Sequence, residues 1–188
     1  VPRPGEMGFD SWEPGSTRNR SGNNVWGHMT VDSERGILYM PIGAPNFDRA
    51  GVGRAGDNLF SNCIVAVDVR TGKYLWHFQV TRHDVWDYDA GSPPTLIDVK
   101  RDGKIIPAII ATNKSSLVFI LDRVTGKPLY DVIDKPVPHD STIPGEKLSP
   151  TQPYPSRPEP LARTTFSRAE LYKGVASHQA YCEKLVDD

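Results

Sequence analysis

A six-residue motif occurs twice in the chain, and this repeat constrains the fold more than any other feature. Residues 68–73 read DVRTGK and residues 122–127 read DRVTGK, 54 positions later. Aspartate and threonine side chains hydrogen-bond to nearby turn amides, and glycine adopts the positive φ of a tight hairpin. A phosphate-binding loop would instead need G-x-x-x-x-G-K-[ST] between a strand and a helix. The motif therefore predicts a structural hairpin turn.

Short strand-like runs surround both motifs in the same order. The first set covers 25–31, 37–43, 63–69 and 74–80, and the second covers 93–99, 105–113, 116–123 and 128–134. A repeat of roughly 40–55 residues with four strands per unit is typical of β-propeller blades. The 16 glycines and 17 prolines among 188 residues also favour short strands and loops over helices. We therefore predict an all-β fold containing two four-stranded antiparallel blades.

Two blades cannot close a ring, because propellers typically have at least four. We therefore expect the chain to be a segment of a longer protein. Residues 1–24 are expected to be the end of a preceding blade or a rim loop, 25–80 a blade, 81–92 an active-site loop and 93–134 a second blade. Residues 135–188 are predicted to be a proline-rich excursion with a short helix. That helix is predicted over 167–185, where Ser167 and Glu170 have the spacing of a capping box.

Charge and cysteine content exclude several classes of protein. The formal net charge of −1 argues against a nucleic-acid-binding protein, which normally carries a basic face. No apolar run approaches the roughly 20 residues of a membrane-spanning helix. The first residues, VPRPGEMGFD, lack the layout of a signal peptide, so an exported protein would be represented by a mature or truncated form. Cys63 and Cys182 are expected to be independent thiols.

One segment stands outside the repeat. Residues 82–89 read RHDVWDYD, with three aspartates, a histidine and two aromatic residues within eight positions. A polar loop capped by its own aspartates and a calcium-binding turn are both compatible with this composition. An active-site loop is the third interpretation, and spacing alone does not decide among them.

The run HDVWDYD resembles the pyrroloquinoline quinone (PQQ)-dependent dehydrogenases, and the glucose dehydrogenase branch most closely. The resemblance also includes W-G-H-M-T-V-D-x-x-R-G-I-L-Y-M-P-I-G-A-P-N upstream and A-T-N-K downstream, and it extends from about residue 15 to residue 171. It implies an eight-bladed propeller that holds the quinone on its axis beside a divalent cation, usually calcium. The implied reaction oxidises a sugar or alcohol hydroxyl to a carbonyl by hydride transfer to the quinone. A propeller scaffold without catalytic activity is the alternative.

The resemblance also implies partners and a compartment. A quinone or a cytochrome would accept the electrons, the remaining blades of the parent chain would complete the ring, and the enzyme would work in the periplasm. The family's usual glutamate ligand of the metal, and an arginine that clamps the cofactor carboxylates, belong upstream of this sequence. The isolated fragment is therefore expected to bind PQQ poorly and to be inactive.

Four residues receive roles from the resemblance. Asp87 matches the general base, since a carboxylate within hydrogen-bond reach can take the hydroxyl proton of the substrate. The resemblance also implies that Asp87 faces the metal. Lys114 matches the lysine that contacts the reactive carbonyls of the quinone, where an ammonium stabilises developing negative charge. Trp26 matches the tryptophan on which the planar cofactor stacks, and Asn46 matches a metal ligand whose amide oxygen suits a hard cation.

Each of these positions has a structural alternative. Trp26 could be an inter-blade packing residue, as we expect for Trp76, while Lys114 and Asn46 could be ordinary surface residues. Other polar residues of these loops are expected to support the site. His83 is expected to orient its loop, Asp84 and Asp89 to bind loop amides or reach the cation indirectly, and Asp48 to lie just outside the metal ligands.

Overall fold

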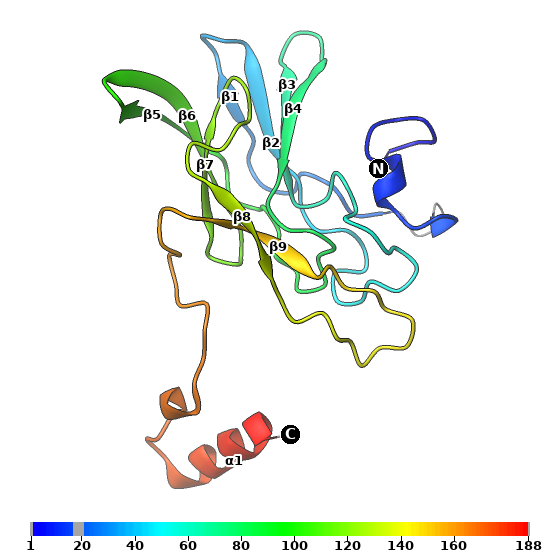
Figure 1. The fold of residues 1–188 in the computed structure, drawn as a ribbon, viewed down its shortest axis with the longest axis vertical. Helices are drawn as coiled ribbons and strands as arrows, with labels where there is room; N and C mark the ends of the chain where they lie inside the picture. The colour runs from blue at the N-terminus through cyan, green and yellow to red at the C-terminus, as the bar shows by residue number, and fades with distance from the viewer. Residues whose placement is uncertain (1, 17–20, 188) are drawn as a thin grey trace.

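The computed structural model describes residues 2–16 and 21–187, and its strands pair into three antiparallel sheets (Figure 1). The expectation for residues 1–24 therefore falls partly outside the described residues. The first sheet has four strands in sequential order, as predicted. Its strands are β1 (Thr30–Asp32), β2 (Ile37–Pro41), β3 (Cys63–Asp68) and β4 (Tyr74–Gln79). The all-β prediction and the four-stranded first blade are confirmed.

The second sheet contains three strands, where the sequence predicted four. It consists of β5 (Thr95–Arg101), β6 (Lys104–Thr112) and β7 (Val118–Asp122). Of the predicted fourth strand over 128–134, the backbone pairs with this sheet through the bridge between Leu121 and Pro128 and the hydrogen bond from the Leu129 N–H to the Ile120 carbonyl oxygen, at 2.8 Å. Proline has no N–H group to donate to a ladder, and residues 132–136 belong to a different sheet. The chain then leaves the sheet.

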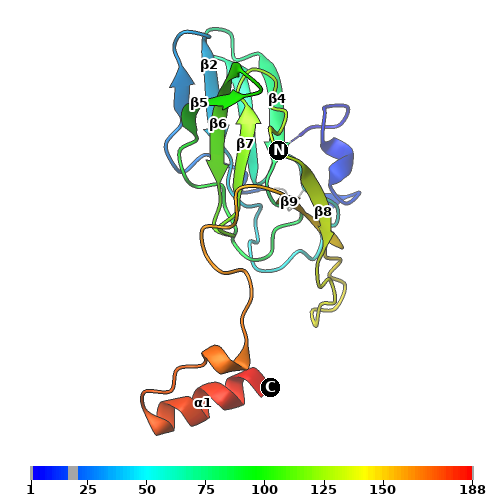
Figure 2. The same cartoon turned by 60° about the vertical axis from the view of Figure 1, so that its left-hand side comes forward.

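A two-stranded ribbon follows, which the sequence analysis did not predict. Strand β8 (Val132–Pro136), which begins inside the predicted strand 128–134, pairs with β9 (Thr151–Pro155) of the region rich in proline. Every strand of a two-stranded ribbon is an edge, and edges tolerate proline. The ribbon lies below the two main sheets, next to the loops that connect their strands (Figures 1 and 2).

The predicted helix at 167–185 is divided into two shorter elements. Ser167 donates its backbone N–H to Glu170 Oε2 at 2.7 Å, as the capping box requires, but only the 3-10 turn Arg168–Glu170 follows. After extended residues that include Gly174, helix α1 (Ala176–Asp187) begins. It lies apart from the sheets at the end of an extended segment (Figure 2). Another 3-10 turn, Phe9–Ser11, lies near the N-terminus. Within the described residues, no helix is long and apolar enough to cross a membrane.

The two repeated turns have the same hydrogen bonds. Asp68 Oδ1 accepts the backbone N–H groups of Arg70 and Thr71, at 3.1 and 2.8 Å. Asp122 Oδ1 accepts those of Val124 and Thr125, both at 2.8 Å. The motif is a structural turn at both sites, as its sequence predicted.

Trp76 joins the two sheets, as predicted for an inter-blade packing residue. It follows the first turn, is buried, and lies against the glycine of the second turn. A Cβ atom at Gly126 would lie 2.6 Å from the indole, so only glycine fits there. The Trp76 ring also contacts the buried ring of Tyr39, with 5.7 Å between centroids. The core of the molecule therefore lies between the sheets.

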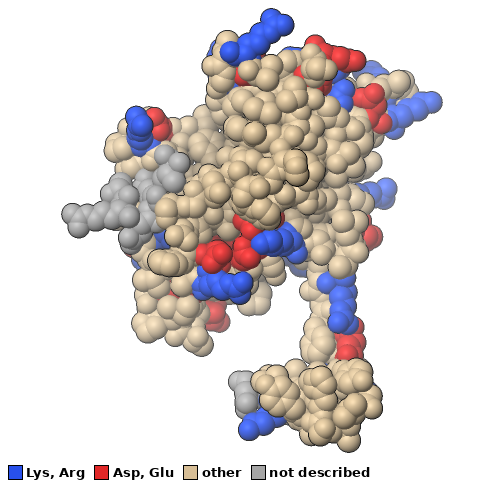
Figure 3. Space-filling view, turned by 180° about the vertical axis from the view of Figure 1, so that it is seen from behind, with Lys and Arg blue, Asp and Glu red and all other residues tan. Residues whose placement is uncertain are grey.

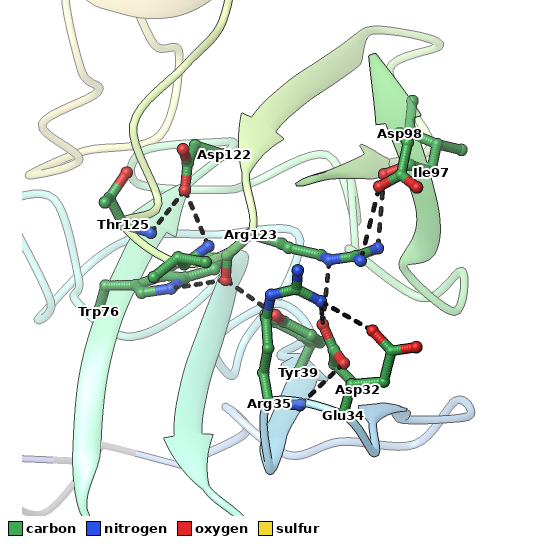
Figure 4. Close-up of polar contacts among 11 residues, drawn as sticks. Asp32, Glu34, Arg35, Tyr39, Trp76, Ile97, Asp98, Asp122, Arg123 and Thr125 are labelled. Atoms are coloured by element: carbon green, nitrogen blue, oxygen red, sulfur yellow. Dashed lines mark hydrogen bonds and ion pairs between the residues drawn. The ribbon is translucent and has the colours of Figure 1, made fainter. Parts of the chain in front are cut away.

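A polar network fixes the two sheets to one another (Figure 4). The carbonyl oxygen of Arg123 accepts hydrogen bonds from Tyr39 Oη at 2.8 Å and from Trp76 Nε1 at 3.3 Å. Its guanidinium forms an ion pair with the buried Asp32, with 3.0 Å between Nε and Oδ2. Burial raises the pKa of Tyr39 to about 12, so this phenol stays a donor. Arg123 therefore binds the first sheet through both its backbone and its side chain.

Candidate functional site

The loop at residues 81–92 is held in shape by its own buried aspartate. Asp84 Oδ1 accepts the N–H of Trp86 at 2.9 Å, and Oδ2 accepts the N–H of Tyr88 at 2.7 Å. Oδ2 also accepts Asn62 Nδ2 at 2.8 Å. Burial raises the pKa of Asp84, while these hydrogen bonds favour its charged form. As expected from the sequence, this carboxylate binds loop amides.

His83 packs the same loop against residues 51–56. Its Nδ1 lies 2.9 Å from the carbonyl oxygen of Gly56, and burial lowers the pKa of the ring. His83 and Asp87 both have positive φ, at 45° and 61°, a conformation that is uncommon for non-glycine residues. The packing of His83 and the hydrogen bonds of Asp84 thus hold the backbone that carries Asp87 in an unusual conformation.

A buried arginine that the sequence analysis missed connects this loop to the preceding one. Arg54 donates from Nη1 to Asn58 Oδ1 at 2.6 Å, and from Nη2 to the carbonyl oxygens of Phe47 and Asp84 at 2.7 and 2.6 Å. Burial lowers its pKa to about 10, opposed by carboxylates that include Asp48. Arg54 therefore supports the site without belonging to it. No sequence signal distinguishes it from the surface arginines of its loop.

Lys114 brings the charged residues of the site together. Its Nζ lies 2.6 Å from Asp89 Oδ2 and 2.9 Å from Asp87 Oδ2. The hydrogen bonds that Lys114 donates to both carboxylates outweigh partial burial and raise the pKa of Lys114. Burial opposes the charge of Asp89, but hydrogen bonds from Lys114 and from the Ala44 amide prevail and lower the pKa of Asp89. The ammonium and the Asp89 carboxylate are therefore both ionised at neutral pH.

The aromatic face predicted for the cofactor adjoins this charged cluster. Trp26 is 57 % exposed, so its indole is not a packing residue of the core. Lys114 Nζ lies 5.6 Å from the centroid of the ring. A flat, accessible aromatic surface beside an ammonium suits a planar ring system that carries oxygen acceptors. Trp26 and Lys114 therefore fit the cofactor that the resemblance implied.

Asn46 is not drawn into the cluster. Its side chain is exposed, and within residues 2–16 and 21–187 no hydrogen bond or ion pair joins it to Asp87 or Lys114. It lies two residues after Ala44, whose N–H donates to Asp89 Oδ1 at 2.6 Å. Among the described residues, no three His, Cys, Asp or Glu side chains form a group that could hold a metal ion. Asn46 and Asp87 alone do not make a cation site.

A cleft of about 740 Å³ adjoins the cluster at Lys114, while Asp87, Asp89 and Trp26 do not line it. Lys114 lies in its lining together with the stacked rings of Trp86 and Tyr88, which are 5.6 Å apart. Gln152 and Tyr154 of the β8–β9 ribbon and Arg163 after it also line the cleft. The unpredicted ribbon therefore forms part of the wall beside the candidate site. Acidic and basic side chains are interspersed on the face drawn in Figure 3, without a continuous basic surface among the described residues there.

Comparison with known proteins gives a consistent result over the whole chain. A family model described as the beta-propeller domain of glucose/ethanol/alcohol dehydrogenase, with the short name PQQ, matches residues 2–188. The glycerol dehydrogenase large subunit of Gluconobacter thailandicus is 42 % identical over 177 residues, which cover 92 % of this chain and 24 % of that protein. The quinate/shikimate dehydrogenase (quinone) of Acinetobacter baylyi is 33 % identical over 172 residues, covering 90 % and 21 %.

Solved structures show the same likeness. The quinohemoprotein alcohol dehydrogenase of Comamonas testosteroni is similar with a TM-score of 0.57 and 34 % identity, over 71 % of this chain and 20 % of that one. A europium-containing methanol dehydrogenase is similar with a TM-score of 0.60 and 25 % identity, over 79 % and 25 %. The chain thus spans about a quarter of the length of the proteins that it matches.

Proposed function

The chain belongs to the PQQ family of glucose, ethanol and alcohol dehydrogenase β-propeller domains, and from this premise we propose that its parent protein is a PQQ-dependent oxidoreductase. The proposed reaction oxidises a sugar or alcohol hydroxyl to a carbonyl. The observation that carries the proposal is the convergence of Asp87, Lys114 and the exposed face of Trp26. When bound, PQQ supplies the acceptor for the hydride, and the protein supplies orientation and electrostatics.

Asp87 is the proposed general base. Both of its ion-pair contacts, with Lys114 at 2.9 Å and with Arg49 at 4.0 Å, are made through Oδ2. We assign the other oxygen, Oδ1, as the atom that accepts the hydroxyl proton of the substrate. The side chain is 29 % exposed, which allows a substrate to approach it. A positioned carboxylate of this kind contributes about 10²- to 10⁴-fold to a proton transfer.

Lys114 and Trp26 are the residues proposed to hold the cofactor. The indole offers an apolar face for a planar ring, and the ammonium beside it, which binds Asp87 and Asp89, has one further N–H to donate to an oxygen atom of that ring. Because Lys114 is already held by two carboxylates, its charge is fixed before any ligand arrives. Such preorganisation of a cation where negative charge develops is an efficient form of electrostatic catalysis.

A divalent cation, calcium or another, is proposed for the parent protein, with Asn46 and Asp87 among its ligands. Calcium takes six to eight oxygen ligands, so most of them would come from segments outside this sequence. Asn46→Ala in the full-length protein is expected to lower the bound calcium content, and an unchanged content would remove Asn46 from the ligand set. A quinone or cytochrome acceptor and a periplasmic location are likewise proposals, which rest on the resemblance in sequence.

The general-base assignment is tested by Asp87→Asn in the full-length protein. We expect turnover to fall by at least about 10²-fold, because an amide cannot accept the proton, while PQQ still binds. Asp102→Asn, which removes an exposed carboxylate from the β5–β6 turn, is the matched control and should retain activity. Full activity of Asp87→Asn would sink the assignment. If the full-length protein shows no bound-quinone absorption after addition of PQQ and calcium, a propeller scaffold is the better description.

A further inference from the structure

Asp89 binds Lys114 more closely than Asp87 does. Its Oδ2 lies 2.6 Å from Lys114 Nζ, against 2.9 Å for Asp87 Oδ2. Its side chain is 8 % exposed, against 29 % for Asp87. The carbonyl oxygen of Asp89 also accepts the backbone N–H of Lys114 at 3.3 Å. One aspartate therefore holds the lysine at its backbone and at the end of its side chain.

The second carboxylate oxygen of Asp89 reaches a different segment. Oδ1 accepts the N–H of Ala44 at 2.6 Å. The preceding residue is Gly43, where a Cβ atom would lie 2.7 Å from the same oxygen and 2.9 Å from Trp26 Nε1. Asp89 thus binds the backbone that passes Trp26, and with its other oxygen it binds Lys114. The side chain connects the two residues proposed to hold the cofactor.

We propose that Asp89 is a positioning residue, which fixes the ammonium of Lys114 between Asp87 and the indole face of Trp26. The inference rests on the proposed function of the same site. A lysine has a long flexible stem, and its free end must lose rotamer freedom to stay in one place. With the Lys114 side chain 44 % exposed, Asp87 alone would compete with water for the ammonium. The charge-assisted hydrogen bond to the buried Asp89 keeps the ammonium in place against water.

Asp84 shows that burial of an aspartate in this loop is not enough for such a role. Its carboxylate is buried as well, but among the described residues its hydrogen bonds come from backbone N–H groups of the loop and from the amide of Asn62. Asp84 thus shapes the loop, whereas Asp89 binds a side chain that faces the site. The two aspartates should therefore respond differently to substitution.

The test uses Asp89→Asn in the full-length enzyme loaded with PQQ. The amide oxygen can still accept the Ala44 N–H, but the amide nitrogen cannot accept a hydrogen bond from Lys114. We expect kcat to fall about 10- to 100-fold while KM and the melting temperature remain close to wild type. Asp102→Asn serves again as the remote carboxylate control. An unchanged kcat would overturn the proposal.

A double-mutant cycle with Lys114→Gln separates positioning from a general structural effect. If Asp89 acts through Lys114, Asp89→Asn has little further effect on kcat in the Lys114→Gln background. The dissociation constant of PQQ, measured by titrating the apoenzyme, should show the same non-additivity. Independent, multiplicative losses in both quantities would refute the role. Coupling of PQQ affinity between the two sites remains measurable even if Asp87→Asn keeps full activity, so failure of the proposed function and failure of this inference are distinguishable.

Discussion

Gly51 and His83 pack so closely that a side chain at position 51 would overlap the His83 ring. A Cβ atom at Gly51 would lie 2.1 Å from His83 Nε2, well inside the contact distance of the two atoms. The φ of Gly51 is not in the left-handed region, so the constraint is the space and not the backbone. Because His83 precedes Asp84 and packs the loop that carries Asp87, any shift of the ring is transmitted toward the proposed site.

Gly51→Ala is therefore expected to destabilise the protein by about 1–3 kcal/mol, the usual range for an overpacked core. Thermal melts of the full-length protein measure the effect. The double variant Gly51→Ala with His83→Ala provides the control, since removal of the ring opens the space that the new methyl group needs. The idea fails if the two substitutions destabilise additively.

At this scale, sequence reasoning succeeded where the chemistry is local. Asp68 and Asp122 bind amides two and three residues away, so their six-residue motif contains all the information that their turns require. It could not identify Arg54 or the contact between Asp89 and Lys114. Those contacts join segments that are distant in sequence, and no spacing encodes them.

Among the secondary-structure elements, the β8–β9 ribbon has the clearest connection to the site. Gln152 of β9 donates from Nε2 to the carbonyl oxygen of Arg82 at 2.8 Å and accepts the N–H of Arg82 on Oε1 at 2.9 Å. The side-chain amide of Gln152 thus pairs with both backbone polar groups of Arg82, as a neighbouring strand would. The side chain of Arg82 also forms an ion pair with Asp134 of β8, at 2.8 Å.

Gln152→Ala is expected to loosen the ribbon from the loop. Loss of both hydrogen bonds leaves a partly buried backbone N–H and carbonyl group without protein partners, at a cost of about 1–3 kcal/mol. Hydrogen exchange of the full-length protein should become faster at Arg82 and across residues 132–155. Gln179→Ala in helix α1 is the matched control, because the side chain of Gln179 donates to Glu183 of the same helix, far from the loop. Unchanged exchange at Arg82 would contradict the coupling.

The elements also show where pattern reasoning reaches its limit. Six strands with β-branched runs and turn residues were predicted within a few positions, whereas the strand predicted over 25–31 is shortened to Thr30–Asp32. The β9 strand, TQPYP, was not, because prolines argue against a strand unless its neighbour is known. The helix over 167–185 was predicted as continuous from one capping signal, yet residues 171–175, between Glu170 and Ala176, form no helix. Without a core beside it, a capping box orders only one turn.

In the whole molecule, the contact of Trp76 with the second turn has no counterpart at the first turn, where the equivalent surface is open. Trp76 covers Gly126, but a Cβ atom at Gly72 in the first turn would meet nothing within 4 Å. Tyr130 follows the second turn at the position that Trp76 holds after the first. Large apolar side chains such as Val31, Val69 and Leu75 are exposed on the first sheet.

We therefore expect these 188 residues, expressed alone, to self-associate or to fold only marginally. At about 25 cal/mol per Å², a few hundred Å² of apolar surface left in water per open face costs several kcal/mol. That is a large part of the roughly 5–15 kcal/mol by which domains are stable. Unpaired sheet edges also favour association. Sedimentation velocity and thermal melts provide the measurement, and a cooperatively unfolding monomer would falsify the expectation.

The seating of Trp76 on Gly126 also defines what can be exchanged in such a chain. The aromatic side chain follows one Asp-x-x-Thr-Gly-Lys turn and contacts the glycine of the next turn, and the two turns are 54 residues apart. A deletion or insertion that ends within a sheet separates the tryptophan from the glycine that it contacts. One that ends at equivalent points of two turns removes or adds one tryptophan and one glycine together. Gene duplication, recombination and designed grafting should therefore preserve the assembly when they run from turn to turn. The unit that can be exchanged therefore runs from one turn to the next, and its ends do not coincide with the ends of a sheet.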